Sequence, residues 1–310
     1  MAFNRVDRDE EERLMTILYV VGNGFDRHHK MATSYVDFGE FLSRNQREVR
    51  TLLDDYFPTY DEHFWHHFEE ELAHFDVEML VQNLEHFIVP YSADDWSDAY
   101  HHDYEYELDR VVEGLSEGLL SAFTEWVGQI ALPSPYSLAV PQARIDPTAR
   151  FINFNYTRTL QELYRVPDDR IWHIHGVAGG TEPLVLGHAW LPSTTETQYA
   201  QLDLERDDTR FIGGALIIDE YFKKTFKPTA KIIAENAARF ASFHDVDDIR
   251  VLGHSLSDVD LPYLQAIASN VGPNAAWRIS FRGEPTAVQQ QFLKIASAKR
   301  ATFWSSLPEV

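Results

Sequence analysis

Apolar residues follow two different patterns along this chain of 310 residues. In the first, a short β-rich run ends at a glycine, as in Thr16–Gly22 (TILYVVG), which is typical of a buried strand in a parallel sheet. Similar runs occur in the second half of the chain: RFINF, RIWHIHG, PLVLG, RFIGGALII, DIRVLG, AWRISF and ATFW. Helical segments such as KPTAKIIAENAARFASF and DLPYLQAIASN separate several of them. This alternation predicts an α/β protein with a mostly parallel, doubly wound sheet.

The second pattern is helical and fills residues 49–132. In its longest segment, YELDRVVEGLSEGLLSAFTEWVGQI, apolar residues recur at steps of three and four and form one stripe. A further helix is expected over residues 35–42, with Thr33–Ser34 as its N-cap. We predict a single domain over residues 1–310, in which helices flank a Rossmann-like sheet. Residues 49–132 would form a large helical insertion that serves as a lid or wall of the site.

The charge balance restricts the class of partner. The chain has 27 Lys and Arg against 49 Asp and Glu, a formal net charge of -22, which opposes binding to phosphate backbones. It has no cysteine, which excludes disulfides and Cys-ligated zinc or iron–sulfur sites and fits a reducing compartment. The first residues, MAFNRVDRDEEERLM, lack the apolar core of a signal peptide, and no run approaches the roughly 18 apolar residues of a membrane span. We therefore expect a cytoplasmic protein that binds neither membranes nor nucleic acid directly.

The turn VVGNGFD follows the first predicted strand and precedes a helix. Gly22 and Gly24 lie where a backbone without Cβ lets a pyrophosphate approach a helix N-terminus. Asn23 and Asp26 could cap the turn or hold a ribose. The third glycine of the dinucleotide fingerprint is missing, so a tight turn that needs positive φ explains the glycines equally well.

The run FINFNYT ends in two asparagines, Asn153 and Asn155. Asparagine is a poor interior strand residue, so both amides are expected at the carboxyl edge of the sheet, where open α/β proteins bind ligands. The alternative is that Asn153 and Asn155 only hydrogen-bond neighbouring loops.

The segment HIHG repeats this arrangement with two histidines. Strand alternation would place His173 and His175 on one face. An imidazole at a strand end, followed by a glycine, is well placed to act as a general base near neutral pH.

The last such strand end is VLGHSLSDVD. Ser255 lacks the flanking pattern of a G-x-S-x-G nucleophile elbow, so we do not expect a serine hydrolase. Gly253 and Ser255 are placed near a ribose or phosphate, Ser257 could cap the next helix, and Asp258 or Asp260 would lie at its start.

Histidines also gather in the helical region. His63, His67, Glu70 and His74 would lie near one helical face, but the chain has neither an H-E-x-x-H motif nor a second ligand pair. We expect no metal and interpret the cluster as a solvated face.

Together, these motifs resemble the bacteriophage abortive-infection AbiH family. The similarity rests on VVGNGFDRHHKMATSYVDF, FINFNYTRTLQELY, HIHG with LVLGH after it, and VLGHSLSDVDLPY, in this order. The family is in turn similar to sirtuin-type NAD-binding proteins, in which a glycine turn, an asparagine motif, a His-Gly and a G-x-S element surround NAD. In bacterial defence members of that wider group, the asparagine and histidine hydrolyse NAD. The resemblance therefore implies Asn155 and His175 as catalytic residues.

Two departures modify this expectation. Where many such proteins have Thr-Asn-Tyr-Asp, this chain has Phe154-Asn155-Tyr156-Thr157, so the acidic partner is missing. The absence of cysteine removes the structural zinc module typical of protein-deacylating sirtuins. Deacylation is therefore not expected.

The leading hypothesis is an antiphage enzyme that hydrolyses NAD, or NADP, at the nicotinamide–ribose bond. His175 would act as general base, and Asn155 would orient the water or the ribose. The residues expected to bind the nucleotide come from all four motifs: Gly22, Asn23, Gly24, Phe25, Asp26, Asn153, Tyr156, Thr157, Gly176, Gly253, His254, Ser255 and Asp260.

Two alternatives remain. Thr157 in place of an acid favours a nucleotide sensor that binds without chemistry. A nuclease acting in phage defence is suggested only by the antiviral association, against the charge of -22. An NAD-depleting enzyme needs restraint in its own cell, so we expect gating by a phage-derived trigger or by assembly into a homo-oligomer.

Overall fold

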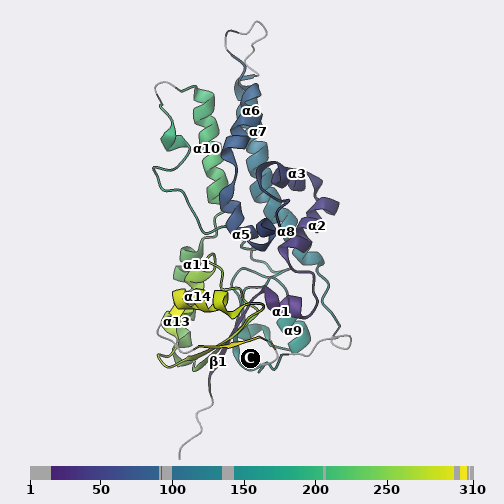
Figure 1. The fold of residues 1–310 in the computed structure, drawn as a ribbon, viewed down its shortest axis with the longest axis vertical. Coiled ribbons are helices and arrows are strands. Elements are labelled where there is room, and N and C mark those ends of the chain that lie inside the picture. The colour runs from purple at the N-terminus through teal and green to yellow at the C-terminus, as the bar shows by residue number, and fades with distance from the viewer. Residues whose placement is uncertain are drawn as a thin grey trace, which may run out of the picture.

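A computed structural model describes residues 15–90, 92, 100–134, 143–204, 207–296, 301–305 and 307. Within these residues a parallel sheet has the strand order β3-β2-β1-β4-β5-β6 (Figure 1). The strands are β1 (Ile17–Val21), β2 (Arg150–Asn153), β3 (Ile171–His173), β4 (Asp248–Leu252), β5 (Ala276–Ser280) and β6 (Ala301–Trp304). The order reverses direction between β1 and β4, which is where doubly wound sheets bind ligands. The predicted Rossmann-like α/β fold is confirmed.

Strand β1 is central because its residues are apolar on both faces. Leu18 and Val20 pack into a buried cluster with residues of α12, α13 and α14, whereas Tyr19 and Val21 pack on the other face with residues of α1 and α9. The helices of this layer are α1 (Asn23–His28), α9 (Thr159–Tyr164), α11 (Thr229–Glu235), α12 (Ala237–Ala241), α13 (Leu261–Asn270) and α14 (Pro285–Ala296).

A second layer, made of helices, stands on the carboxyl edge of the sheet (Figure 1). It contains α2 (Tyr35–Asn45), α3 (Arg47–Tyr56), α4 (Glu62–His66), α5 (Phe68–Glu71), α6 (Val77–Leu84), α7 (Tyr100–Glu113), α8 (Leu119–Gln129) and α10 (Thr209–Lys224). These helices share one buried core, rich in aromatic residues. The helical pattern of residues 49–132 therefore corresponds to most of this layer, which also includes α2 and α10.

The start of α2 is fixed as the sequence predicts. Ser34 is the N-cap, and its side chain and that of Asp37 form a reciprocal capping box. Two donors at the helix N-terminus are thereby satisfied.

Two strand predictions are wrong. RFIGGALII forms the first part of α10. The buried residues Gly214, Ala215, Ile218 and Phe222 of this helix recur at helical spacing. A Cβ on Gly214 would lie 2.6 Å from the Tyr104 ring, so the missing side chain lets α10 pack closely on α7. The run therefore completes the helical layer rather than the sheet.

The segment PLVLG forms no strand. Its backbone instead bonds to loops, with Val185 N donating to the His175 carbonyl at 2.9 Å. His188, just after it, forms an isolated parallel bridge with Phe226. We call residues 183–188 the strap, because they bond to His175 of the site and to the residues that follow α10.

None of the described helices is long and apolar enough to cross a membrane. The charged residues 1–14 lie outside the described part of the chain.

Candidate functional site

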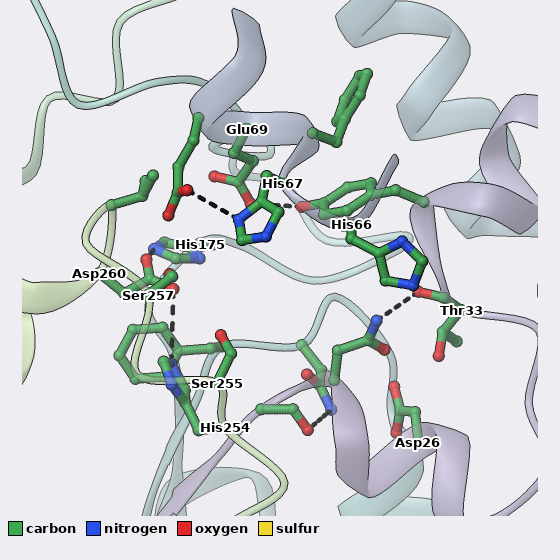
Figure 2. A pocket seen from close by; sticks show the side chains of 18 of the residues that line it. Asp26, Thr33, His66, His67, Glu69, His175, His254, Ser255, Ser257 and Asp260 are labelled. Carbon is green, nitrogen blue, oxygen red and sulfur yellow. Dashed lines mark hydrogen bonds and ion pairs between the residues drawn. The ribbon is translucent and has the colours of Figure 1, made fainter. Parts of the chain in front are cut away.

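A pocket of about 660 Å³ lies between the carboxyl edge of the sheet and the helical layer (Figure 2). Its lower wall comes from the segments that follow β1, β2, β3, β4 and β5, and its upper wall from α5, α8 and neighbouring residues. Ten of the sequence-predicted site residues border it: Gly22, Asn23, Asp26, Asn155, Tyr156, Thr157, His175, His254, Ser255 and Asp260. The predicted residues Gly24, Phe25, Asn153, Gly176 and Gly253 do not.

The glycine turn after β1 is locked against the turn after β4. A Cβ on Gly24 would lie 2.7 Å from the Gly253 carbonyl oxygen, and one on Gly22 would lie 2.6 Å from the His254 Cα. Neither Gly22 nor Gly24 has positive φ, whereas Gly253 does, at +63°. The alternative of a turn that needs positive φ is therefore wrong for the first turn, whose glycines allow close packing of two backbones.

This packing also occupies the amides of the turn. Gly22 N donates to the Leu252 carbonyl, Gly24 N to the Gly253 carbonyl and Phe25 N to the Gly22 carbonyl, at 3.0, 2.7 and 2.9 Å. These three N–H groups are committed within the protein. The turn therefore lacks the free row of amides that usually cradles a pyrophosphate.

Both asparagines hydrogen-bond neighbouring backbone. Asn153 Oδ1 accepts from Asn155 N at 3.0 Å, and Asn155 Nδ2 donates to the Gly22 carbonyl at 3.1 Å. Asn153 thus holds the backbone of its own segment, as the loop-bonding alternative proposes. Asn155 makes such a bond and also borders the pocket.

The two histidines of HIHG have different surroundings. Strand β3 ends at His173, so alternation does not continue to His175 and the prediction of a shared face is wrong. His173 Nδ1 lies 3.1 Å from the Asn155 carbonyl oxygen, and its Nε2 lies 3.1 Å from Gln161 Nε2. His175 borders the pocket, and only 2% of its surface is exposed.

A buried charge cluster connects the sheet edge to the helical layer. The ammonium of Lys227, which is completely buried, lies 2.5 Å from Glu69 Oε2 and 3.1 Å from Asp260 Oδ1. Tyr35 donates a hydrogen bond to the other oxygen of Glu69. Burial lowers the pKa of Lys227, but the two carboxylates raise it above its usual range. With one cation and two carboxylates, the cluster has a formal charge of −1.

Asp260 also faces both pocket histidines. Its carboxylate oxygens lie 3.6 Å from His175 Nε2 and 3.6 Å from His254 Nε2. Burial opposes ionisation of Asp260, but Lys227 and the two imidazoles outweigh it and lower its pKa to about 2. Asp260 is therefore ionised at neutral pH. It stands at the N-cap position of α13 without a side-chain cap bond, so neither it nor Ser257 caps that helix.

A strained residue fixes the orientation of His254. Leu256 has φ of +58°, which is rare for a residue with a Cβ, and its fully buried side chain holds it in place. In this conformation Leu256 N donates to His254 Nδ1 at 2.9 Å. Neutral His254 must then carry its proton on Nε2, the nitrogen that faces Asp260.

His175 is a neutral base at neutral pH. Burial, together with Lys227 and His254, lowers its pKa to about 3, against the opposing effect of Asp260. Its Nε2 is buried without a hydrogen-bond partner among the described residues, so the bond to the Phe154 backbone uses the other ring nitrogen. At neutral pH this nitrogen is unprotonated and can accept a proton, and its lowered pKa makes it a weak base.

Aromatic rings enclose this nitrogen. The Phe154 ring lies edge-to-face with both imidazoles, at 5.2 Å from His175 and 4.4 Å from His254. The Tyr263 ring lies 5.4 Å from His175 on another side. Both imidazoles are therefore shielded from water by aromatic rings as well as by the charge cluster, and this loss of hydration is the main cause of their lowered pKa values.

A buried acid, Asp26, contacts Thr157, the position at which the resemblance implies an acid. Thr157 Oγ1 donates to Asp26 Oδ2 at 2.6 Å, and Asp26 Oδ1 is buried with no hydrogen-bond partner in the described part of the chain. Burial raises the pKa of Asp26 to about 6, against the hydrogen bonds from Thr157, Thr159 and Asn155. Asp26 thus places a carboxyl group beside Thr157.

This buried acid predicts a pH-dependent stability. In the folded state Asp26 has a pKa of about 6 against 3.8 for the unperturbed group, so folding favours its protonated form. Its contribution becomes unfavourable as pH rises from about 4 through 6, up to about 3 kcal/mol. We expect Asp26→Asn to be more stable than wild type by about 1–3 kcal/mol in urea unfolding at pH 8, and this difference to shrink towards pH 4. An equal difference at both pH values would contradict the buried carboxylate.

The comparison with family models matches residues 18–281 to the family described as bacteriophage abortive infection AbiH. The chain belongs to the AbiH family. Membership indicates a role in abortive infection, a defence against bacteriophage. Neither curated proteins nor solved structures gave a match.

In this AbiH chain, the residues that complete the charge cluster, Glu69 and Lys227, were not predicted from the sequence. Lys227 lies beyond every motif, and the strap that contains LVLGH positions it: Lys227 N donates to the His188 carbonyl at 2.8 Å, and His188 N to the Thr225 carbonyl at 3.0 Å. A Cβ on Gly187 would lie 2.0 Å from the Thr225 carbonyl oxygen, which explains the glycine. The motif LVLGH was the available signal in the sequence. The sequence does not show that this motif pairs with residues 225–227.

The histidine cluster of the AbiH helical layer offers no metal site. His67 Nδ1 lies 3.0 Å from Glu70, while His63 and His74 lie 3.5 and 3.4 Å from Glu71. Among the described residues, no group of three or more ligands could hold a metal ion. His66 and His67 instead border the pocket from above (Figure 2).

Proposed function

We propose that the protein hydrolyses NAD at the nicotinamide–ribose bond. The observation that carries this proposal is His175: a buried, neutral imidazole whose Nε2 lacks a partner, next to ionised Asp260 in a pocket at the switch point of the sheet. The fold and family resemblance named above agree with a nucleotide substrate. Ten residues expected from that resemblance border one pocket.

The shape of the pocket suits an elongated ligand. Its walls follow five adjacent strands from β3 to β5. Because neighbouring strands lie about 4.8 Å apart, the loops after β2 and β5 are separated by roughly 14 Å. A volume of about 660 Å³ falls within the usual range for small-molecule sites. A dinucleotide can span such a site with its two halves in different subsites.

The charge of the site suits a cation. The cluster of Lys227, Glu69 and Asp260 has a net formal charge of −1 and lies at the end of the pocket that contains His175. The nicotinamide ring of NAD is cationic, and positive charge moves to the ribose as the glycosidic bond breaks. Fixed negative charge in a water-poor site stabilises that transition state.

The proposed reaction needs one base and no acid. Water forms a bond to C1′ of the ribose as the bond from C1′ to nicotinamide breaks, and the electron pair of that bond leaves with neutral nicotinamide. The water loses a proton, which His175 Nε2 accepts, and ADP-ribose is the other product. A weak base suffices because the oxocarbenium-like centre is a strong electrophile. We assign Asn155, held by its bond to the Gly22 carbonyl, to orient the water or the ribose.

Chromatography of NAD incubated with the protein tests this proposal. We expect nicotinamide and ADP-ribose in equal amounts, either from purified protein or from phage-infected cells that express it, since we also propose restraint by a phage-derived trigger or by self-assembly. Unchanged NAD in both settings, at the level of a His175→Ala variant, would overturn the proposal.

One observation favours a second candidate, a nucleotide sensor without chemistry. The amides of the glycine turn and both asparagines are engaged in bonds within the protein. Calorimetry that shows NAD binding without product, with the trigger present, would favour this candidate.

A further inference from the structure

One wall of the pocket has no part in the proposed chemistry. It is formed by α14 and the loop after β5, with Ala287, Val288 and Gln291 from the helix and Phe281 and Arg282 from the loop. Residues 287 and 288 lie one helical turn before Gln291, so the three side chains share a face. This face offers an apolar surface with a single amide at its end.

In the described part of the chain, the side-chain amide of Gln291 lacks a hydrogen-bond partner for its oxygen. Gln291 Oε1 is buried without a hydrogen-bond partner among the described residues. A buried amide oxygen without a partner destabilises the folded protein, because its bonds to water are lost and not replaced. Such a group in a pocket wall is explained when a ligand supplies the missing partner.

We propose that this wall is a subsite for adenine, which lies against Ala287 and Val288 and hydrogen-bonds Gln291. A glutamine amide presents a donor and an acceptor side by side, and adenine presents the complementary pair at N6 and N7. The inference rests on the proposed function, since NAD supplies the adenine. It adds a recognition site for the half of the substrate that does not react.

The position of the wall fits the geometry of a dinucleotide. The loop after β5 lies beyond that after β4 in the sheet, whereas Asn155 follows β2 on the other side of β1. Ser255 and Ser257, from the segment after β4, border the pocket between these two ends. The exposed side chains of Arg282 and Glu284 border the same side with opposite charges. A ligand with adenine on α14 therefore extends across the switch point towards His175.

The first test measures binding of AMP by calorimetry, without reference to cleavage. The test variant is Gln291→Leu, which keeps the size of the side chain and removes the amide. Gln290→Leu, on the same helix, exposed and outside the pocket, is its matched control. We expect Gln291→Leu to bind AMP about three- to tenfold more weakly, as for loss of one or two neutral hydrogen bonds, and Gln290→Leu to bind as wild type does.

The second test uses nicotinamide mononucleotide, which has the scissile bond but no adenosine. We expect Gln291→Leu to raise KM for NAD about three- to tenfold and to leave cleavage of the mononucleotide unchanged. Equal AMP binding by wild type and Gln291→Leu would overturn the adenine subsite while leaving the hydrolase proposal intact. AMP binding that depends on Gln291, in a protein that never cleaves NAD, would support the subsite and remove the hydrolase.

Discussion

Replacing His175 by alanine is expected to lower kcat for NAD cleavage by roughly a hundred- to ten-thousandfold, the usual contribution of a general base. The imidazole Nε2 is the buried, unpartnered base beside Asp260, and alanine leaves no group there to accept the proton of the attacking water. The loss should appear in kcat rather than in KM, because the base acts in the transition state. Rates of nicotinamide release at saturating NAD measure it.

Binding of AMP by His175→Ala distinguishes a loss of catalysis from a loss of folding. His175 packs against Phe154 and Tyr263, so the variant also loses some stability, and AMP calorimetry must show a formed pocket. His86→Ala, at an exposed histidine in the helical layer, is the control and should match wild type. Turnover in His175→Ala within threefold of wild type would remove His175 from the role of base.

Lys227→Met is expected to lower the free energy of unfolding by about 3–5 kcal/mol, the usual cost of breaking a buried ion pair. Lys227 is completely buried between Glu69 and Asp260, and methionine fills its volume without its charge. Two carboxylates then remain buried without their cation. Their pKa values rise, since Lys227 lowers both. Urea unfolding at pH 7 measures the loss.

An exposed lysine provides the comparison. Lys231 pairs with Glu235 at 3.9 Å on the surface of α11, and Lys231→Met should change stability by less than about 0.5 kcal/mol. The difference in free energy of unfolding between Lys227→Met and Lys231→Met isolates the effect of burial. A loss below about 1 kcal/mol in Lys227→Met would contradict a buried cluster that joins the helical layer to the sheet.

The sequence predicts the sheet well because its strands are short β-rich runs, several of them separated by helical segments. β1, β2, β3, β4, β5 and β6 all lie in predicted runs, and their carboxyl ends meet at one edge. RFIGGALII was misassigned because a buried helix and a buried strand are both continuously apolar, and only the packing of Gly214 on α7 distinguishes them. Local pattern therefore identifies the scaffold but not the partner of every apolar run.

The candidate site was predicted only where it follows strands. Asn155, His175 and His254 stand at strand ends, so the topology alone brings them together. Glu69 and Lys227 come from helical and connecting segments 158 residues apart in the chain, and no local pattern pairs them. Asp26 bonds Thr157 through a contact across 131 residues. Such pairs depend on tertiary packing, which periodicity does not encode.

The most direct test of the central claim is mass spectrometry of NAD incubated with the protein in ¹⁸O-labelled water, under the conditions that activate it. Hydrolysis at the nicotinamide–ribose bond should give unlabelled nicotinamide together with ADP-ribose that carries one ¹⁸O, because water attacks the ribose carbon. Products cut at the diphosphate, or labelled ADP-ribose formed equally by His175→Ala, would contradict it.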